Sequence, residues 1–331
     1  MRWLVRFMLL TLGSGLICTS TNFAEAQSYP TQPVRILVPY AAGGTPDIIS
    51  RVIAPQLSQK FGQSFLVENK AGGSGIPAVQ ELLRSPADGH TILMSDTQTL
   101  CINPFLHPML SYHPARDFSP VTYAASVPLY LAVQSSLGVN TLAELIALAK
   151  AKPGELTYGS SGNGSIHHIA MESFNALTGA NLRHIPYRGA AQSVPAFIRG
   201  EISVVMAAYS SVQGFLDSGK IKLLAISSLK RAPETPDVAP LSELLRADFD
   251  FSSEMGFSLR AGTPQGIVES LSREIVAALR NPDNARILRG AGVVIEATSA
   301  PEYKDKIVRD LVKFEKAVKT SGAMTESGFG R

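Results

Sequence analysis

The chain has 331 residues, of which 45% are hydrophobic and 17% are charged, and its formal net charge is +3. This near-neutral, mixed balance excludes the basic surface that a nucleic-acid-binding protein shows, so no nucleic acid partner is predicted. The length is ample for two domains of ordinary size, each built around a hydrophobic core.

The first 26 residues are predicted to be a secretory signal peptide, outside the folded protein. Arg2 and Arg6 give a positive start, an apolar stretch follows at 7–18, and Ala-Glu-Ala at 24–26 supplies the small residues of a cleavage site. We therefore expect an exported protein that is cleaved near Ala26/Gln27. No later apolar run reaches the roughly 18 to 20 residues that a membrane span needs.

The two cysteines add to this picture. A lipoprotein anchor at Cys18 is disfavoured, because bulky Ile17 stands where a small residue is wanted. Loss of the signal peptide leaves Cys101 as the one cysteine of the mature chain, which therefore has no internal disulfide. Cys101 lies among apolar residues and is expected to pack in the core.

Short apolar runs alternate with helical patterns along the chain. Strands are predicted at 34–40, 64–69 and 90–96, and helices at 47–61 and 75–85; Pro55 should kink or shorten the first helix. The same alternation continues through strands at 130–134, 156–162, 182–187, 202–208 and 222–228, with helical segments at 142–152, 167–179, 193–200 and 212–219. Two longer helices are predicted at 263–281 and 300–322. This alternation indicates an α/β fold with mainly parallel sheets.

Two extended stretches are predicted to cross between the domains, at 118–133 and 223–240, because each leads into a loop marked by proline. The chain is accordingly divided into a discontinuous domain 1, residues 27–124 plus 228–331, and a domain 2, residues 125–227.

Glycine pairs or clusters stand at four junctions between an apolar run and a helical pattern, at 36–50, 68–78, 158–170 and 185–196. A glycine loop that enters a helix exposes backbone N–H groups without an intrahelical partner, and these donors and the helix dipole favour an anion. The alternative is that these glycines only make tight turns. Two such loops in separate domains favour a shared ligand.

The missing residues decide which anion is favoured. The lysine of a P-loop is absent from these loops, and His167 stands where the last glycine of a dinucleotide fingerprint would follow Gly162 and Gly164. Phosphate is therefore disfavoured and carboxylate is favoured, since a few neutral donors suffice for it.

Catalytic and metal sites are not predicted. The serine-rich loop at 159–163 lacks the last glycine of the nucleophile elbow, and His167 and His168 are adjacent instead of four residues apart. His168 is expected to cap or pack at its helix start, and Asp47 to complement a helix dipole. No cofactor is predicted. An exported serine hydrolase acting through Ser161 or Ser165 remains the alternative from another functional class.

At several places the sequence resembles a known family. The segments "YPTQPVRILVPYAAGGTPDIISRVIAPQL", "ENKAGGSG", "SPADGHTIL", "LTYGSSGNGSIHH", "HIPYRGAAQSVPAFIRGEI" and "GKIKLLAISSLKR" are similar to the substrate-binding proteins of tripartite tricarboxylate transporters, the Bug-type receptors. The resemblance covers residues 29–322 and keeps the order of the motifs.

The resemblance implies a periplasmic binding protein of type II, with two α/β domains joined by two crossing strands and a ligand cleft between them. It implies a monomer that grips a carboxylate between one loop of each domain and delivers the ligand to the permease subunits of a tripartite transporter. The implied ligand-binding residues are Tyr40, Ala41, Ala42, Gly43, Gly44, Asp47, Ser160, Ser161, Gly162, Asn163, Gly164, Ser165, His168, Tyr187 and Arg188. Arg188 either adds charge to the grip or is solvated. A receptor of the same fold that presents its ligand to a signalling partner is the runner-up.

Two departures from the family pattern fall at positions that set specificity. Ala207, Ala208 and Tyr209 follow the strand after which the family usually has an aspartate. Glu254 stands near the usual position of a tryptophan, and Arg260 replaces a proline. The carboxylate grip is therefore expected, whereas the ligand itself is left open.

Overall fold

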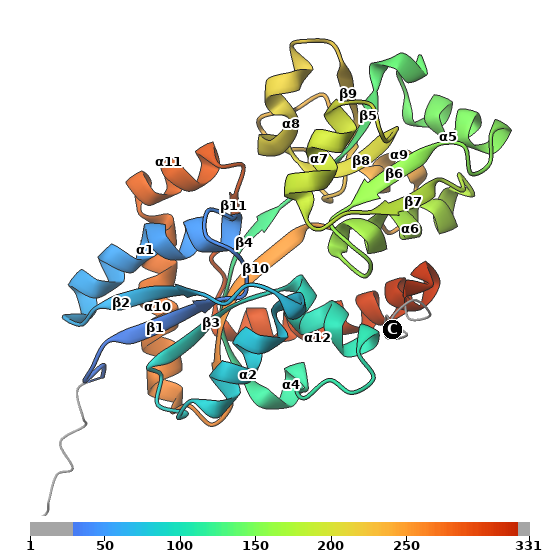
Figure 1. The fold of residues 1–331 in the computed structure, drawn as a ribbon. Coiled ribbons are helices and arrows are strands. Elements are labelled where there is room, and N and C mark those ends of the chain that lie inside the picture. Colours follow the sequence, from blue (N-terminus) through green and yellow to red (C-terminus); the bar gives the residue numbers. More distant parts are fainter. Residues whose placement is uncertain (1–28, 324–331) are drawn as a thin grey trace, which may run out of the picture.

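The computed structural model describes residues 29–323, which form two β-sheets with helices packed against them. The predicted signal peptide, its cleavage site near Ala26/Gln27 and Cys18 lie outside the described residues. We call the six-stranded sheet with its helices the first lobe and the five-stranded sheet with its helices the second lobe. Figure 1 shows the two groups of elements apart from each other, with β4 and β10 running from one toward the other.

The first sheet has the strand order β11-β4-β10-β3-β1-β2. β1 pairs in parallel with β2 and β3, whereas β10 is antiparallel to both β3 and β4. Its strands are β1 (Val34–Val38), β2 (Phe65–Asn69), β3 (Thr91–Asp96), β4 (Phe118–Val127), β10 (Ser253–Arg260) and β11 (Val294–Ile295). Its helices are α1 (Thr45–Phe61), α2 (Ile76–Arg84), α3 (Asn103–Leu106), α4 (Pro114–Asp117), α10 (Gln265–Arg280), α11 (Pro282–Gly290) and α12 (Ala300–Ser321), with short turns at Gly73–Gly75 and Gln98–Ile102.

The apolar run of β1 is explained by burial on both faces of this sheet. Val34, Ile36 and Val38 pack in the cluster with α1 and α10, whereas Leu37 packs in the cluster on the opposite face. A strand covered on both sides needs apolar residues at successive positions, which is the pattern of a parallel sheet in an α/β fold. The prediction of an α/β fold is confirmed. The expectation of mainly parallel sheets is wrong, because β10 in this sheet and β5 (Leu129–Gln134) in the second sheet are each antiparallel to the strands on both sides of them.

The second sheet has the strand order β7-β6-β8-β5-β9. β6 is parallel to β7 and β8, whereas β5 is antiparallel to β8 and β9. Its strands are β5 (Leu129–Gln134), β6 (Thr157–Ser160), β7 (Arg183–Pro186), β8 (Val204–Ala208) and β9 (Ile221–Ile226). Its helices are α5 (Leu142–Ala151), α6 (Ile166–Thr178), α7 (Ala190–Ile198), α8 (Tyr209–Leu216) and α9 (Leu241–Leu245), with a short turn at Ser135–Leu137.

Two connections join the sheets. β4 leads directly into β5 with Pro128 between them, inside the stretch predicted to cross. The second connection leaves β9 at Ile226 and returns to the first sheet at Ser253. It crosses later than the predicted stretch at 223–240, because a bridge from Ile226 to Pro240 keeps that stretch beside the second sheet. The domain boundaries at 124/125 and 227/228 stay a prediction.

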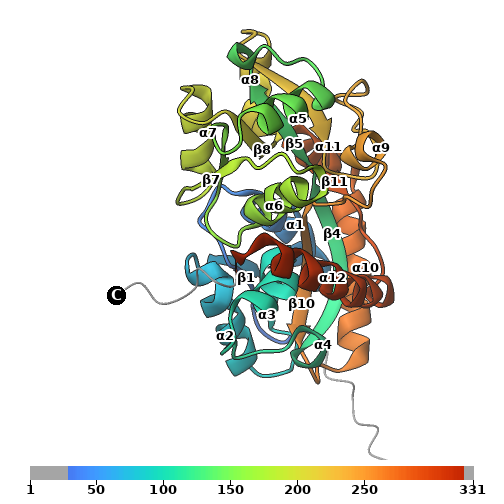
Figure 2. The same cartoon turned by 90° about the vertical axis from the view of Figure 1, so that its right-hand side faces the viewer.

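The last helix links the lobes. α12 contacts α6 as well as β4, and Figure 2 shows it running below α6. Phe314 and Val318 of α12 belong to the same buried cluster as Ile169 and Phe174 of α6. The two lobes therefore share a hydrophobic contact at α12 in addition to their chain connections.

Helix α1 contains Pro55 in its interior. The helix begins at Thr45 and continues past Pro55 to Phe61, so the proline does not shorten it. Pro55 lies on the exposed face, where the lost backbone hydrogen bond is accessible to water. Among the described residues, no helix is long and apolar enough to span a membrane.

Candidate functional site

The first glycine loop connects β1 to α1 at the carboxyl ends of the parallel strands. Ala41, Ala42 and Gly43 are exposed, and Gly44 precedes the first turn of α1. Gly43 has a φ of +86°, a conformation that favours glycine. The first-turn N–H groups of a helix have no intrahelical acceptor, so this loop presents neutral donors at the edge of the sheet.

Asp47 anchors this loop from inside the helix. Its carboxylate accepts hydrogen bonds from the Gly43 backbone N–H at 2.9 Å, from Arg51 Nε at 2.9 Å and from Asn69 Nδ2 at 2.9 Å. Burial raises the pKa of Asp47, but these hydrogen bonds outweigh it, so the pKa lies below its usual value. Both carboxylate oxygens are thus engaged by the protein, and Asp47 shapes the loop through these contacts.

Tyr40 fixes the other end of the loop. Its hydroxyl donates to Asp96 at the end of β3, and its carbonyl accepts from Asn69 Nδ2 at 3.0 Å. Asp96 also accepts from the backbone N–H of Thr99 at 2.9 Å and from its hydroxyl at 2.8 Å. Burial raises the pKa of Tyr40, and the nearby Asp96 carboxylate raises it further.

Asp96 and Asn69 were not predicted as site residues. Each is the last residue of a strand, and such positions meet at one edge of a parallel sheet. That position was the available signal in the sequence.

The glycine loop before α2 packs against the same edge. A Cβ atom on Gly75 would lie 2.6 Å from Thr99 Cγ2 and 3.0 Å from Pro39 Cβ. Asn103 Nδ2 of α3 donates to the Ser74 carbonyl at 2.8 Å. The absence of a side chain at Gly75 therefore lets this loop approach the first glycine loop closely.

The second-lobe loop runs from the end of β6 into α6. Ser160 Oγ accepts from the Gly162 N–H at 3.0 Å and contacts the Gly162 carbonyl at 3.1 Å, which closes a tight turn. Ser165 caps α6 by accepting from the His168 N–H at 3.3 Å, and His168 Nδ1 accepts from the Gly164 N–H at 3.0 Å. His168 is buried and acts as a cap and packing residue. Asn163 is exposed at the tip.

A stack of three aromatic rings contacts this loop. The His168 and His184 rings are stacked with centroids 4.0 Å apart, and His184 stacks on Tyr158 at 4.9 Å. His184 Nε2 lies 2.6 Å from Ser160 Oγ. Desolvation lowers the pKa of both histidines to about 4, so they are neutral at neutral pH and add no charge to the loop. His184 was missed from the sequence, because its role depends on stacking between strands and a helix.

The Tyr187–Arg188 turn is fastened to the same loop. The Tyr187 N–H donates to the Ser160 carbonyl at 3.2 Å, and the Gly189 N–H donates to the Ser161 carbonyl at 3.2 Å. Tyr187 is half-buried, whereas the Arg188 side chain is exposed beside the start of α7. Of the two predicted residues, Arg188 is the one free to reorient toward an anion.

The second-lobe loop meets the first lobe at α3. A Cβ atom on Gly164 would lie 2.3 Å from Leu106 Cδ1. α3 thus has the Gly162–Gly164 turn against Leu106 at its end and the Ser74 carbonyl against Asn103 at its start. The short helix α3 therefore has the first-lobe loop before α2 at its start and the second-lobe loop before α6 at its end. No hydrogen bond in the described part of the chain joins residues 40–44 directly to residues 160–165.

The two departures from the family pattern lie in different surroundings. Ala208 ends β8, is half-buried and packs against the hydrophobic cluster of the first lobe that Tyr40 also contacts. Glu254 is buried on β10, and its carboxylate lies 2.8 Å from Lys306 Nζ of α12. Burial and the Asp310 carboxylate raise the pKa of Glu254 to about 8, against the opposing effect of Lys306. Glu254 is therefore engaged by α12, whereas Ala208 lies where the lobes approach each other.

The hydrolase alternative receives little support from the geometry. Ser161 Oγ lies 2.8 Å from His167 Nδ1, but desolvation lowers the pKa of His167 to about 4, which makes it a weak base. No acidic side chain among residues 29–323 is hydrogen-bonded to the His167 ring, so the third member of a triad is not present there.

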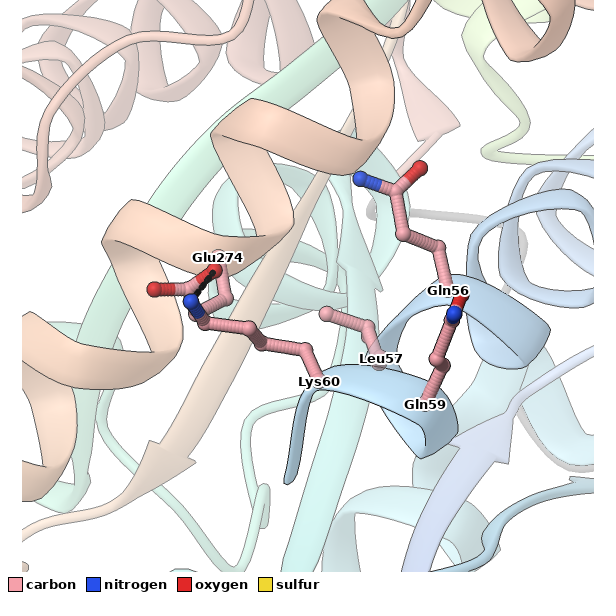
Figure 3. A pocket seen from close by; sticks show the side chains of 5 residues that line it. All are labelled: Gln56, Leu57, Gln59, Lys60 and Glu274. Atoms are coloured by element: carbon pink, nitrogen blue, oxygen red, sulfur yellow. Dashed lines mark ion pairs between the residues drawn. The ribbon is translucent and has the colours of Figure 1, made fainter. Parts of the chain in front are cut away.

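Two surface pockets lie away from these loops. One is lined by α1 and α10, where Lys60 and Glu274 form an ion pair at 3.9 Å (Figure 3). The other is lined by α10 and the segment that leads into α12. Neither pocket includes any of the predicted ligand-binding residues.

Comparisons with known proteins establish the family. The family described as "Tripartite tricarboxylate transporter family receptor" matches residues 49–322. The chain belongs to this family. It is 30% identical to protein BugT of Bordetella pertussis, over 90% of this chain and 92% of that protein.

Solved structures of similar proteins share the fold. Rpa4515 of R. palustris with adipate is 32% identical, with a TM-score of 0.79 over 89% of this chain and 98% of that chain. MatC (Rpa3494) from Rhodopseudomonas palustris with bound malate is 25% identical, with a TM-score of 0.75 over 88% of this chain and 100% of that chain. The resemblance to Bug-type receptors and the two-lobed binding-protein fold are confirmed. The prediction of a receptor instead of an enzyme is also confirmed, since this is a family of solute-binding receptors.

Proposed function

We propose that this family receptor is a periplasmic protein that captures a small carboxylate between its two lobes and delivers it to the membrane permease of a tripartite tricarboxylate-type transporter. The observation that carries the proposal is the pairing of two loops, one in each lobe, that present neutral backbone donors at the starts of α1 and α6. Adipate and malate, bound in the two related structures, are both carboxylates.

The proposed grip uses the residues predicted from the sequence. The loops at residues 40–44 and 160–165 would supply the backbone N–H groups that are not already used within them. The N–H groups of Gly43, Gly162 and Gly164 are used, since they donate to Asp47, Ser160 and His168 and so shape the loops. Tyr187 would line the site, and Arg188 would supply positive charge at its rim. The proposal includes the division into domains 27–124 plus 228–331 and 125–227, cleavage near Ala26/Gln27, and a monomer without a cofactor.

Carboxylate binding is tested by a thermal-shift screen with adipate, malate, other dicarboxylates, tricarboxylates and aromatic acids. A ligand that binds the folded state raises the Tm by mass action. At a ligand concentration of 100 times Kd, the added free energy of unfolding is roughly 2.7 kcal/mol. Uncharged diamides of adipate and malate are the matched controls and should leave the Tm unchanged. A Tm shift with a neutral solute but with none of the carboxylates would contradict the proposal.

A further inference from the structure

Ser227 occupies the place where the two connections between the lobes come together. It follows the last residue of β9, and it is fully buried, with an exposed fraction of 0%. Leu129 opens β5 directly after Pro128 of the first connection, and Phe251 stands shortly before β10 on the second. Both of these residues are also buried.

Backbone hydrogen bonds join the three segments side by side. The Ser227 N–H donates to the Leu129 carbonyl at 2.7 Å, and the Phe251 N–H donates to the Ser227 carbonyl at 3.2 Å. These bonds lie one residue beyond the last β5–β9 pair, Tyr130 with Ile226. The ladder of the second sheet is thus continued into the region between the sheets.

The Ser227 hydroxyl makes two further hydrogen bonds to the same segments. We call the contact of Ser227 with Leu129 and Phe251 the seam. Its oxygen accepts from the Leu129 N–H at 2.9 Å, and its proton is donated to the Phe251 carbonyl at 2.8 Å. A single hydroxyl therefore bridges one buried backbone donor and one buried backbone acceptor on different connections. Without it, both groups would lose their partner away from water, which is unfavourable for buried polar groups.

Lys313 Nζ of α12 also donates to the Asp250 carbonyl on the second connection at 3.1 Å. Two other contacts between the lobes differ in kind. α12 meets α6 through apolar side chains, and Gly164 meets Leu106 by van der Waals contact. Such surfaces slide or separate without breaking directional bonds, whereas the seam is held by four hydrogen bonds at one residue. Lobe movement therefore has to pivot about the seam, where both chain connections are fixed together.

We propose that Ser227 is a positioning residue that couples the two connections into one pivot and so defines the direction in which the lobes move. This inference rests on the proposed function in one respect, namely that ligand capture uses movement of the lobes. Loss of the hydroxyl removes two of the four hydrogen bonds and leaves the two backbone bonds, so the connections are coupled less tightly and the range of lobe orientations should widen.

The test uses a pair of spin labels, one in each lobe, and measures the distribution of distances between them by pulsed electron–electron double resonance. No ligand is present. Exposed Gln59 of α1 and exposed Gln213 of α8 are replaced by cysteine for labelling, and buried Cys101 by alanine. Ser227→Ala is expected to widen the distance distribution. The matched control is Ser95→Ala, because Ser95 is equally buried and its hydroxyl bonds to Gly256 O, Ser258 Oγ and Tyr303 Oη within the first lobe.

The control should lower the Tm and leave the width unchanged. If Ser227→Ala does not fold, Ser227→Cys carries the test, since a thiol is a weaker donor and acceptor of similar size; mass spectrometry confirms that only two labels are attached. A folded Ser227 variant with the width of the parent, or an equal widening in Ser95→Ala, would overturn the proposal. Because no ligand is used, this result is independent of whether any carboxylate raises the Tm.

Discussion

Asp47 shows how one side chain can shape a glycine loop from inside the helix that follows it. Its carboxylate receives a loop N–H, an arginine and an asparagine, so the charge is neutralised and the loop is held at the start of α1. Ala41 and Ala42 of the same loop are exposed. In the proposed grip, this buried carboxylate would therefore support anion binding by holding the loop in place.

Asp47→Ala is predicted to lower the free energy of unfolding by about 2–3 kcal/mol, because hydrogen bonds to a buried charged group are lost and their donors are left unpaired. Urea denaturation measures this change. Asp305→Ala, at an exposed position of α12, is the control and should stay within about 0.5 kcal/mol of the parent.

The same variant carries a pH dependence. Since the pKa of Asp47 is lowered in the folded state, its contribution is present above the unfolded-state pKa and is lost as the pH falls through the folded-state value. The difference between parent and Asp47→Ala should thus be largest at neutral pH and decrease below about pH 4. A difference that is constant over this range would contradict the assignment.

For single residues, the sequence predicts those at the helix starts of the glycine loops better than it predicts the side chains that contact these loops from other strands. Asp47 and His168 are recognisable because each stands at a helix start. Asp96 and His184 are not, because Asp96 meets Tyr40 across neighbouring strands and His184 reaches Ser160 from β7. Those contacts depend on the order of the strands in each sheet, which the spacing of residues within a short segment does not predict.

Helix α6 combines two glycines of similar conformation in different surroundings. Gly164 before the helix has a φ of +71°, and Gly179 after it has a φ of +67°. A Cβ on Gly164 would lie 2.3 Å from Leu106 Cδ1 of the other lobe, whereas one on Gly179 would lie 3.5 Å from Lys150 Cε, an ordinary contact. The pair separates the cost of backbone strain from the cost of a clash between the lobes.

Gly179→Ala is predicted to lower the free energy of unfolding by about 1–2 kcal/mol through left-handed strain alone. Gly164→Ala should cost about 1–3 kcal/mol more, because the added methyl meets a packed side chain. Urea denaturation of both variants measures the difference. The excess cost should vanish when Gly164→Ala is made in a Leu106→Ala background; if it persists there, Leu106 is not its cause.

Element prediction succeeded where local signals are strong. Glycine loops entering helices were predicted at all four junctions, and the start of α1 fell within two residues of the observed position. The return of the second connection to the first sheet was placed too early, because proline marks irregular backbone without saying which sheet it follows. Likewise, the apolar spacing of α12 predicts a buried face but does not indicate that α6 covers part of it.

Three histidines of the second lobe share one electrostatic property that affects the stability of the whole molecule. Desolvation lowers the pKa of His167, His168 and His184 to about 4, and the neighbouring His168 contributes at His184. The unfolded chain binds protons at these sites from about pH 6.5 downward, so stability is full above that pH and decreases toward pH 4.

Unfolding free energy measured by urea denaturation is predicted to fall as the pH is lowered from about 6.5 to about 4. His184→Phe keeps a ring in the stack but removes one titrating group, so its stability should fall less steeply, after a loss of about 1 kcal/mol at neutral pH from the missing Ser160 contact. His113→Phe, at an exposed position, is the control for replacing a histidine. Parallel curves for the parent and His184→Phe would contradict this account.

The position of β10 between β3 and β4 has a consequence for how the chain assembles. The strands of the second sheet all come from one continuous stretch, whereas the first sheet lacks a central strand until residues 253–260 have been made. Contacts between β10 and β3 close a loop that contains the whole of the second sheet, and such distant pairings form slowly. The second lobe therefore has all its strands available early, while β1, β2 and β3 must wait, with one edge unpaired, for the end of the chain to arrive.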